Sequence, residues 1–214
     1  MEHRNLQTLF ALFLAFSFLS CNAQEKKSNT SKTHIGGHCE GCEALLEYGD
    51  KNLKSVDTLP GFETNNPKLK VYGTVYKKDG KTPAENVIVY IYHTNRKGIY
   101  ETKGNETGWG KRHGFIRGWT KTDKDGKYAF YTFRPASYPN TTIPQHIHVT
   151  IKEPNKNPYF IDDFHFVDDP NLTSSIKNNR QNRGGSGIMT AKMQDGLPTV
   201  KRDIVLGLNI PDYY

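Results

Sequence analysis

The sequence predicts an all-β protein, an antiparallel β-sandwich with long irregular loops and a short N-terminal extension. Three observations support this fold class. Several short segments beyond residue 60 are rich in Val, Ile, Tyr, Phe and Thr, the residues favoured in strands. Clusters of Gly, Pro, Asn and Asp separate these segments and predict turns. Helical periodicity is nearly absent from the same region.

The composition fits one globular domain. The 214 residues are 35% hydrophobic and 12% aromatic, which is enough to build one well-buried core. Charged residues make up 24% of the chain and exclude a polytopic membrane protein, while the Tyr and Phe content argues against global disorder. The formal net charge of +7 permits an anionic partner without identifying one.

The N-terminal segment is predicted to be a secretory signal. Residues 6–19 are apolar, but they are too few to span a bilayer, which needs roughly 20 residues. Residues 18–21 (FLSC) resemble a bacterial lipobox, in which the cysteine becomes the lipidated first residue of the mature protein. We therefore expect residues 1–20 to be removed and the protein to be exported, with a lipid on Cys21 as its contact with the membrane. An ordinary signal peptide with an incidental cysteine is the alternative.

The composition of the chain changes near residue 69. Residues 21–68 are expected to form a tether and an N-terminal extension, since residues 24–32 are polar and non-periodic. A short helix is expected at 43–53, where leucines supply the apolar positions. Residues 69–214 are expected to form the sandwich domain.

Cys39 and Cys42 lie within the extension in the sequence CEGC. In an oxidising compartment, a local disulfide is the favoured interpretation of such a close pair. His34 and His38 lie beside it and leave metal binding as an alternative, although two cysteines with nearby histidines form a loose pattern.

The predicted strands are spread along the sandwich domain. They cover residues 69–76, 87–93, 116–122, 127–133, 146–152, 159–166 and 203–208. Residues 123–126 have the Asp-Gly turn chemistry of a hairpin between the third and fourth of these strands. Residues 94–115 and 178–187 are expected to be irregular, because they are rich in Gly and in charged or polar residues.

The first sign of chemistry is His146 and His148, two positions apart on a predicted strand. Because strand side chains alternate, both imidazoles point to one face, and Ile147, Val149 and Ile151 point to the other. The apolar face belongs in the core, so the histidines face a cavity or solvent. Two neutral imidazoles side by side suit a transition metal. A chance pair on a solvated face is the alternative.

Five short segments resemble, in the same order, the recurring motifs of the intradiol ring-cleavage dioxygenases, the family of protocatechuate and catechol dioxygenases. These segments are Gly73–Val75, Gly98–Tyr100, Arg117–Phe130, Pro135–Tyr138 and His146–His148. The resemblance covers about residues 69–152 and leaves the N-terminal extension outside. Five ordered segments are far more specific than any one of them.

The resemblance implies a mononuclear ferric ion held by Tyr100, Tyr138, His146 and His148. It further implies an enzyme that binds both hydroxyls of a catechol-like diol, displaces Tyr138 from the iron and cleaves the ring with O₂. Hard anionic phenolates suit Fe(III), and no nicotinamide, flavin or haem is implied. Arg117 is carried over as a second catalytic residue beside Tyr138, and an ion pair that braces the sandwich is its alternative role.

The chain departs from the family at one position that contacts substrate. Many members carry an Arg three residues before the first ligand His, where it stabilises charge on the substrate, and here that position is Ile143. The loss puts ordinary catechol or protocatechuate turnover in question more than it questions iron binding. Lys111, Arg112 and His113, in the loop before Arg117, are candidates for a replacement charge.

Other classes of function fit less of the sequence. A non-catalytic, exported β-sandwich binding domain of the prealbumin or carboxypeptidase-regulatory type would share Gly73–Val75 and Thr122–Phe130. Such a domain has no reason to carry Tyr100, Tyr138 and the two histidines together. A nucleic-acid partner is not expected, because the chain has an export signal and no dense basic segment. A hydrolase is not expected, because Gly185–Gly187 lacks the nucleophile-elbow pattern.

Overall fold

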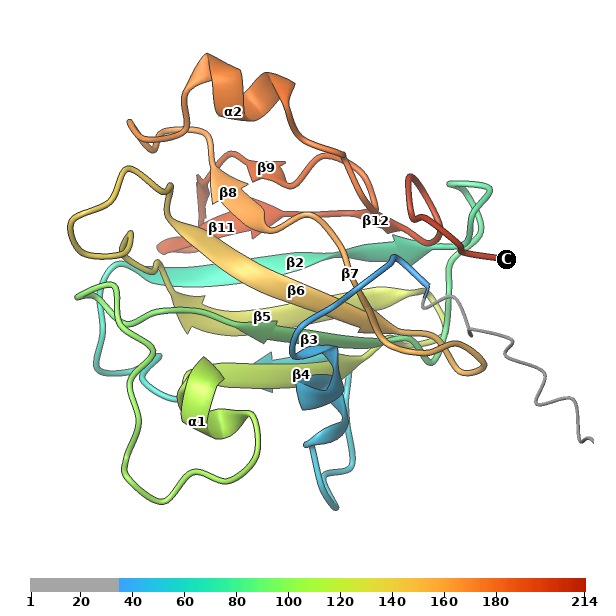
Figure 1. Ribbon diagram of the computed structural model, residues 1–214, viewed down its shortest axis with the longest axis horizontal. Coiled ribbons are helices and arrows are strands. Elements are labelled where there is room, and N and C mark those ends of the chain that lie inside the picture. Colours follow the sequence, from blue (N-terminus) through green and yellow to red (C-terminus); the bar gives the residue numbers. More distant parts are fainter. Residues whose placement is uncertain (1–34) are drawn as a thin grey trace, which may run out of the picture. The chain divides into compact units, whose positions relative to one another are not determined.

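Two six-stranded β-sheets pack face to face in the computed structural model, which describes residues 35–214 (Figure 1). The first sheet has the order β1 (Val56–Thr58), β5 (Lys127–Phe133), β2 (Lys68–Tyr76), β11 (Leu197–Lys201) and β10 (Lys192–Gln194), with β12 (Ile204–Val205) also paired to β2. The second has the order β4 (Arg117–Lys121), β3 (Ile88–Tyr92), β6 (His146–Lys152), β8 (Phe164–Phe166) and β9 (Ile188–Met189), with β7 (Tyr159–Phe160) paired to β6. The predicted β-sandwich is confirmed.

The two sheets are mixed rather than purely antiparallel. Four strand pairs are parallel, namely β1–β5, β2–β11, β2–β12 and β8–β9. Each of these pairs joins segments that are well separated along the chain, so the connection is long enough to return in the same direction. The hydrophobic pattern of a strand does not specify the direction of its partner.

The hairpin predicted around residues 123–126 is wrong, although the turn itself is present. β4 pairs with β3 in the second sheet, whereas β5 pairs with β1 and β2 in the first. The turn therefore carries the chain from one sheet to the other. The Asp123 carboxylate accepts hydrogen bonds from the backbone N–H groups of Asp125 (3.0 Å) and Lys127 (2.9 Å). Asp-Gly chemistry thus sets the reversal of the chain, and long-range pairing sets which sheet each strand joins.

Other strands differ from the prediction in length. The predicted strand at 159–166 is divided into β7 and β8, which both pair with β6 and are separated at residues 161–163. Only β12 forms within 203–208. The sequence pattern does not predict β1, β9, β10 and β11. These strands are short, the side chains of β10 are all exposed, and β11 contains Pro198, so none shows a clear strand pattern.

The described helices are short. η1 (Cys42–Leu46) is a 3₁₀-helix of five residues, so the helix expected at 43–53 is present only in its first part. α1 (Gly110–His113) lies within the predicted loop at 94–115, and α2 (Ser174–Asn178) precedes the irregular segment. Between residues 35 and 214, no helix is long and apolar enough to cross a membrane.

The N-terminal extension packs against the sheets from residue 35 onward. Ala44 and Leu45 of η1 are fully buried against Tyr90 and Trp119, which lie on β3 and β4. The indole N–H of Trp119 donates to the carbonyl oxygen of Leu45 at 2.9 Å. Together with the pairing of β1 to β5, these contacts make residues 35–68 part of the same packed unit as the rest of the sandwich.

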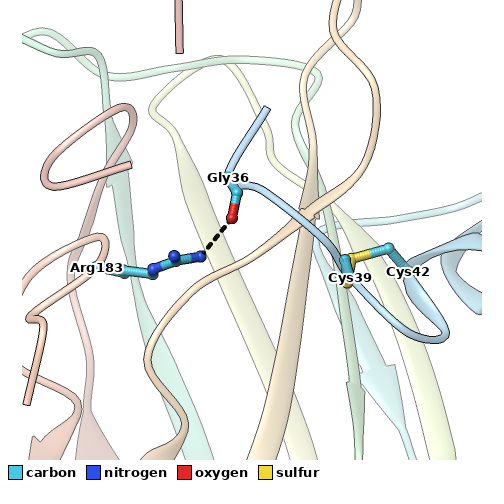
Figure 2. Close-up of a disulfide and its surroundings, with 4 residues drawn as sticks. All are labelled: Gly36, Cys39, Cys42 and Arg183. Carbon is cyan, nitrogen blue, oxygen red and sulfur yellow. Dashed lines mark hydrogen bonds between the residues drawn. A yellow bond between two sulfur atoms is a disulfide. The ribbon is translucent and has the colours of Figure 1, made fainter. Parts of the chain in front are cut away.

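Figure 2 shows the disulfide between Cys39 and Cys42, which was the favoured interpretation of the CEGC sequence. A few residues before it, the carbonyl oxygen of Gly36 accepts a hydrogen bond from the buried guanidinium of Arg183 at 2.9 Å. The predicted signal peptide and the lipidated cysteine lie outside the described residues, as does His34.

The core lies between the two sheets and is built by strands whose side chains alternate. In β6, Ile147, Val149 and Ile151 are between 0% and 2% exposed and belong to the main apolar cluster. The predicted separation of this strand into an apolar face and a histidine face is therefore confirmed. His146 and His148 lie on the opposite face, which is the outer face of the second sheet.

A buried histidine, His93, links the two sheets. Its Nδ1 lies 2.8 Å from the carbonyl oxygen of Thr94, and its Nε2 lies 2.7 Å from the hydroxyl of Thr132 on β5. The carbonyl can only accept, so Nδ1 carries the proton and Nε2 accepts from the threonine. Burial lowers the pKa of His93 to about 4, because the charged form would lose its hydration.

We predict that His93 makes the fold sensitive to acid. The unfolded chain takes up a proton at this ring below pH 6.5, whereas the folded chain resists protonation until about pH 4. Its contribution to stability is therefore intact above pH 6.5 and is lost as the pH falls toward 4. A shift of this size corresponds to roughly 3 kcal/mol.

Denaturant unfolding between pH 8 and pH 4 checks this expectation against His93→Gln, which keeps an amide near the threonine and cannot be protonated. The variant should be less stable at pH 8 and should lose less free energy of unfolding on acidification. Parallel pH profiles for the two proteins would refute the assignment.

Candidate metal centre

Four polar side chains converge at one end of β6. His146 and His148 come from the strand itself, Tyr138 from the loop between β5 and β6, and Tyr100 from the loop between β3 and β4. The structure therefore brings together all four residues that the sequence analysis assigned to a metal.

The distances among these four groups suit ligands of a single ion. The Nε2 atoms of His146 and His148 are 3.1 Å apart. The hydroxyl of Tyr100 lies 2.7 Å from Nε2 of His148, and that of Tyr138 lies 3.2 Å from Nε2 of His146. The two hydroxyls are also hydrogen-bonded to each other. Donor atoms about 2 Å from a common ion lie roughly 3 Å from one another, which is the spacing found here.

The outer nitrogens of the two imidazoles are occupied by acceptors. Nδ1 of His146 lies 2.7 Å from the carbonyl oxygen of Pro144, and Nδ1 of His148 lies 3.1 Å from Oδ1 of Asp163. These acceptors assign the ring protons to Nδ1, so both Nε2 atoms present lone pairs to the same point. Two lone pairs at this separation repel unless a cation or a hydroxyl proton lies between them, and the donor set therefore fits a metal ion.

The protonation of the tyrosines also fits a site that is completed by an ion. Burial raises the pKa of both Tyr100 and Tyr138, so their phenols are neutral in the protein without an ion. Burial lowers the pKa of His146, which keeps its imidazole neutral. An ion of high positive charge would stabilise two phenolates in this half-buried site, and its binding would release their protons.

Asp163 is close to the cluster but does not face its centre. Ligand atoms of Asp163, His146 and His148 lie within 4.8 Å of one another. The carboxylate, however, is bonded to Nδ1 of His148, on the far side of the ring from the two tyrosines. Burial raises the pKa of Asp163, but the neighbouring imidazoles, chiefly His148 and its hydrogen bond, outweigh this effect and hold the pKa below its usual range.

The loops that carry the tyrosines are joined through their backbones. Gly98 has a φ of 77°, and a Cβ at this position would lie 2.0 Å from the carbonyl oxygen of Ser137. The hydroxyl of Thr94 also donates to the carbonyl oxygen of Ala136 at 2.7 Å. This close approach places the segment before Tyr100 directly against the segment before Tyr138, which explains why the two hydroxyls meet.

Arg117 lies outside the cluster. Its guanidinium donates to the carboxylate of Glu47 at 2.6 Å and stands over the ring of Trp119 at 5.2 Å. In the strand register, Tyr92 lies between Arg117 and His148. These contacts fit the alternative role that the sequence left open, an ion pair that braces the sandwich, and they do not bring Arg117 to the donor atoms.

Two of the three candidates for a replacement charge, Arg112 and His113, are engaged elsewhere. Arg112 forms an ion pair with Glu40. His113 is buried, its Nδ1 lies 2.9 Å from the hydroxyl of Tyr90, and burial lowers its pKa to about 4, so it is neutral at physiological pH. Ile143 itself is 45% exposed in the loop before His146.

Sequence reasoning missed two features beside the ligands. The ring of Tyr92 stacks on His148 with centroids 4.5 Å apart. A cavity of about 270 Å³ is lined by His148, Asp163 and Tyr92 together with residues 38–41 of the disulfide loop. The signal for Asp163 in the sequence is a pair of aspartates inside an apolar strand segment, and the sequence around residue 40 predicts a disulfide or a separate metal site but no contact with the cluster.

Comparisons with known proteins show which family the chain resembles. The family model described as Dioxygenase matches residues 49–204. Catechol 1,2-dioxygenase 1 of Acinetobacter lwoffii is 33% identical over 89 residues, which cover 40% of this chain and 26% of that protein. The protocatechuate 3,4-dioxygenase beta chain of Burkholderia cepacia is 28% identical over 137 residues, 58% of each chain. The chain thus spans less than two thirds of the length of these relatives.

Solved structures show the same fold. Catechol 1,2-dioxygenase from Acinetobacter sp. ADP1, inhibited by bound mercury, superposes with a TM-score of 0.53 at 19% identity, covering 71% of this chain and 56% of that one. The dioxygenase domain of a carbohydrate-binding fusion protein from Streptomyces sp. SirexAA-E gives a TM-score of 0.51 at 22% identity, covering 65% and 79%.

We predict that Gly98→Ala separates the two tyrosines, because the new methyl group would collide with the carbonyl oxygen of Ser137. Gly104→Ala is the matched control. Gly104 lies in the same loop and also has a positive φ, of 91°, but no atom lies within 4 Å of the place that its Cβ would occupy. Each variant should lose about 1–3 kcal/mol from the strained backbone.

Only Gly98→Ala should also lose metal binding, by at least about tenfold. Metal content after equilibration with Fe(III), together with denaturant unfolding, separates the two effects. Equal metal binding by the two alanine variants would contradict the role of the close approach.

Proposed function

This chain belongs to the intradiol dioxygenase family, and we propose that it cleaves the ring of a catechol-like aromatic diol with O₂ by means of a mononuclear non-haem Fe(III). The observation that carries the proposal is the convergence of two tyrosine hydroxyls and two imidazole lone pairs on one point. This donor set is the one that the family resemblance assigns to ferric iron.

Tyr100, Tyr138, His146 and His148 would hold the iron. Anionic oxygen donors favour the ferric state, and the two neutral imidazoles leave enough positive charge to attract an anionic diol. Bound Fe(III) supplies a Lewis acid that lowers the pKa of the two substrate hydroxyls and draws electron density toward itself.

The protein's own groups have separate tasks in this proposal. The carbonyl oxygen of Pro144 and the carboxylate of Asp163 hold the Nδ1 protons and so fix both imidazoles. Tyr92 limits rotation of the His148 ring by stacking on it. The family resemblance implies that Tyr138 would give up its place to the diol, and its Oη would then accept a proton from the substrate. Tyr138 lies on a loop and is partly exposed, which is compatible with this role, although Tyr100 shares both properties.

We also propose that the protein is exported and anchored by a lipid on Cys21. The apolar segment at 6–19 and the lipobox-like sequence at 18–21 support this localisation. The disulfide between Cys39 and Cys42 supports it independently, because disulfides persist in oxidising compartments.

The localisation predicts a clear difference between the wild type and Cys21→Ser. Expressed in a bacterial host, the wild-type chain should fractionate with membranes, and mass spectrometry should find an acylated cysteine at its mature N-terminus. The Cys21→Ser variant should appear in the soluble fraction. A wild-type chain that is soluble and unacylated would contradict the lipid anchor and leave an ordinary signal peptide.

The proposed reaction predicts a coloured iron protein. Purified mature chain loaded with Fe(III) should bind one iron and show a visible tyrosinate-to-iron absorption band. Anaerobic catechol should shift this band, and ¹⁸O₂ should place two labelled atoms in a ring-opened product. A chain that stays colourless and iron-free after reconstitution would contradict the proposal and favour the non-catalytic binding sandwich.

Substitution of single ligands should show what each contributes to the tyrosinate-to-iron absorption band. Tyr138→Phe should lose part of the band and retain iron, because one phenolate remains. His148→Ala should lose the metal. Tyr131→Phe serves as the control, since Tyr131 packs against Phe62 away from the cluster, and it should leave the spectrum unchanged.

A further inference from the structure

The hydrogen bond between Asp163 and His148 follows from strand register. In the antiparallel pair of β6 and β8, His146 lies opposite His165 and Ile147 lies opposite Phe164. One step further along the same register places Asp163 opposite His148. Residues that are directly opposite in a sheet share a face, so the carboxylate and the imidazole are cross-strand neighbours on the outer face of the second sheet.

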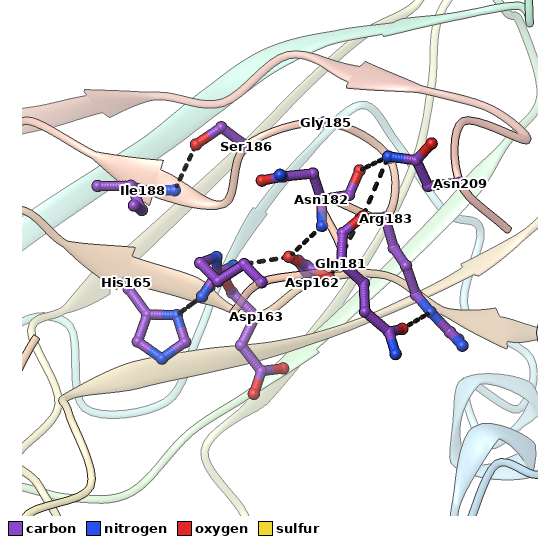
Figure 3. Close-up of polar contacts among 12 residues, drawn as sticks. Asp162, Asp163, His165, Gln181, Asn182, Arg183, Gly185, Ser186, Ile188 and Asn209 are labelled. Carbon is purple, nitrogen blue, oxygen red and sulfur yellow. Dashed lines mark hydrogen bonds and ion pairs between the residues drawn. The ribbon is translucent and has the colours of Figure 1, made fainter. Parts of the chain in front are cut away.

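The break between β7 and β8 is held in place by the irregular segment that follows α2. As Figure 3 shows, Asp162 binds this segment: its carboxylate accepts from the backbone N–H groups of Asn182 (2.9 Å) and Arg183 (3.2 Å). The guanidinium of Arg180 donates to the carbonyl oxygen of Asp163 at 2.8 Å and pairs with the carboxylate of Asp162 at 3.2 Å. These contacts fix the backbone of Asp163 at the place where its carboxylate reaches His148.

The pair is also partly shielded from solvent. The side chains of His148 and Asp163 are 25% and 32% exposed, and both residues line the cavity that residues 38–41 of the disulfide loop also line. A hydrogen bond between an ionised carboxylate and an N–H is stronger where water is partly excluded. Among residues 35–214, the Asp163 carboxylate has one hydrogen-bond partner, Nδ1 of His148.

We propose that Asp163 is a positioning residue of the metal centre, which holds the Nδ1 proton of His148 and thereby presents the Nε2 lone pair to the ion. A carboxylate behind a ligand imidazole fixes the ring tautomer and increases the basicity of the ligand nitrogen. The inference rests on the proposed function, because the ion it serves is the iron of that proposal. It extends that proposal to a residue outside the four ligands and to the segment around Arg180 that orients it.

The test compares Asp163→Ala, Asp163→Asn and Asp168→Asn in the full mature chain. The asparagine at 163 keeps an acceptor for the N–H but removes the charge. Asp168 is the control, because it is a mostly exposed carboxylate bound to Arg134 beyond the end of β8. Iron affinity is measured by competition with a chelator, and the tautomer of His148 is measured by ¹⁵N NMR of the iron-free protein, a readout that a general loss of stability does not change.

Asp163→Ala should weaken iron binding by about 10- to 100-fold and should give a mixture of His148 tautomers. Asp163→Asn should fall between this variant and the wild type and keep the single tautomer with the proton on Nδ1. Asp168→Asn should match the wild type in both measurements.

Two outcomes separate this inference from the proposed function. A wild-type chain that takes up no iron overturns the proposed function. A wild type that binds iron, combined with an Asp163→Ala variant of equal affinity and unchanged tautomer, overturns only the role of Asp163.

Discussion

The alternation of side chains along β6 is the constraint on which the rest of the structure depends. In seven residues this strand contributes three aliphatic side chains to the core and two imidazoles to the opposite face. β6 is paired on both sides, with β3 along one edge and with β7 and β8 along the other, so its backbone is held by ladders in both directions. A slip of one residue would exchange the two faces. The register that packs the core of the sandwich therefore also fixes the position of the donor nitrogens.

The two tyrosines depend on a different kind of support. Tyr100 and Tyr138 are on loops, and their meeting depends on the close approach of Gly98 to Ser137 and on the hydrogen bond between Thr94 and Ala136. The two histidines are consequently held by the hydrogen bonds of the sheet, whereas the two tyrosines are held by the contact between two loops. This difference suits a centre in which a tyrosine ligand is the one to be exchanged.

The site residues could be predicted from the sequence where they depend on local patterns. Period-two alternation identified the outward-facing histidines, and the ordered motifs of the family resemblance added both tyrosines. What the sequence could not provide depends on contacts between distant segments. Asp163 reaches His148 only through the register of β6 and β8, and Glu47 meets Arg117 only because η1 folds back onto the second sheet. The turn at Asp123 has hairpin chemistry, but its flanking strands pair with other strands in opposite sheets.

The two ends of the described chain close on each other. The N–H of Gly36 donates to the carbonyl oxygen of Pro211 at 2.7 Å, and Ile210 belongs to the main apolar cluster. Both ends lie outside residues 49–204, which match the family model. The packed domain therefore extends beyond the matched region at both ends. A fragment cut at the limits of homology would lose the carbonyl that caps the Trp119 indole and one wall of the cavity beside His148. The segments on either side of the matched region, within residues 35–214, are therefore part of the packed domain.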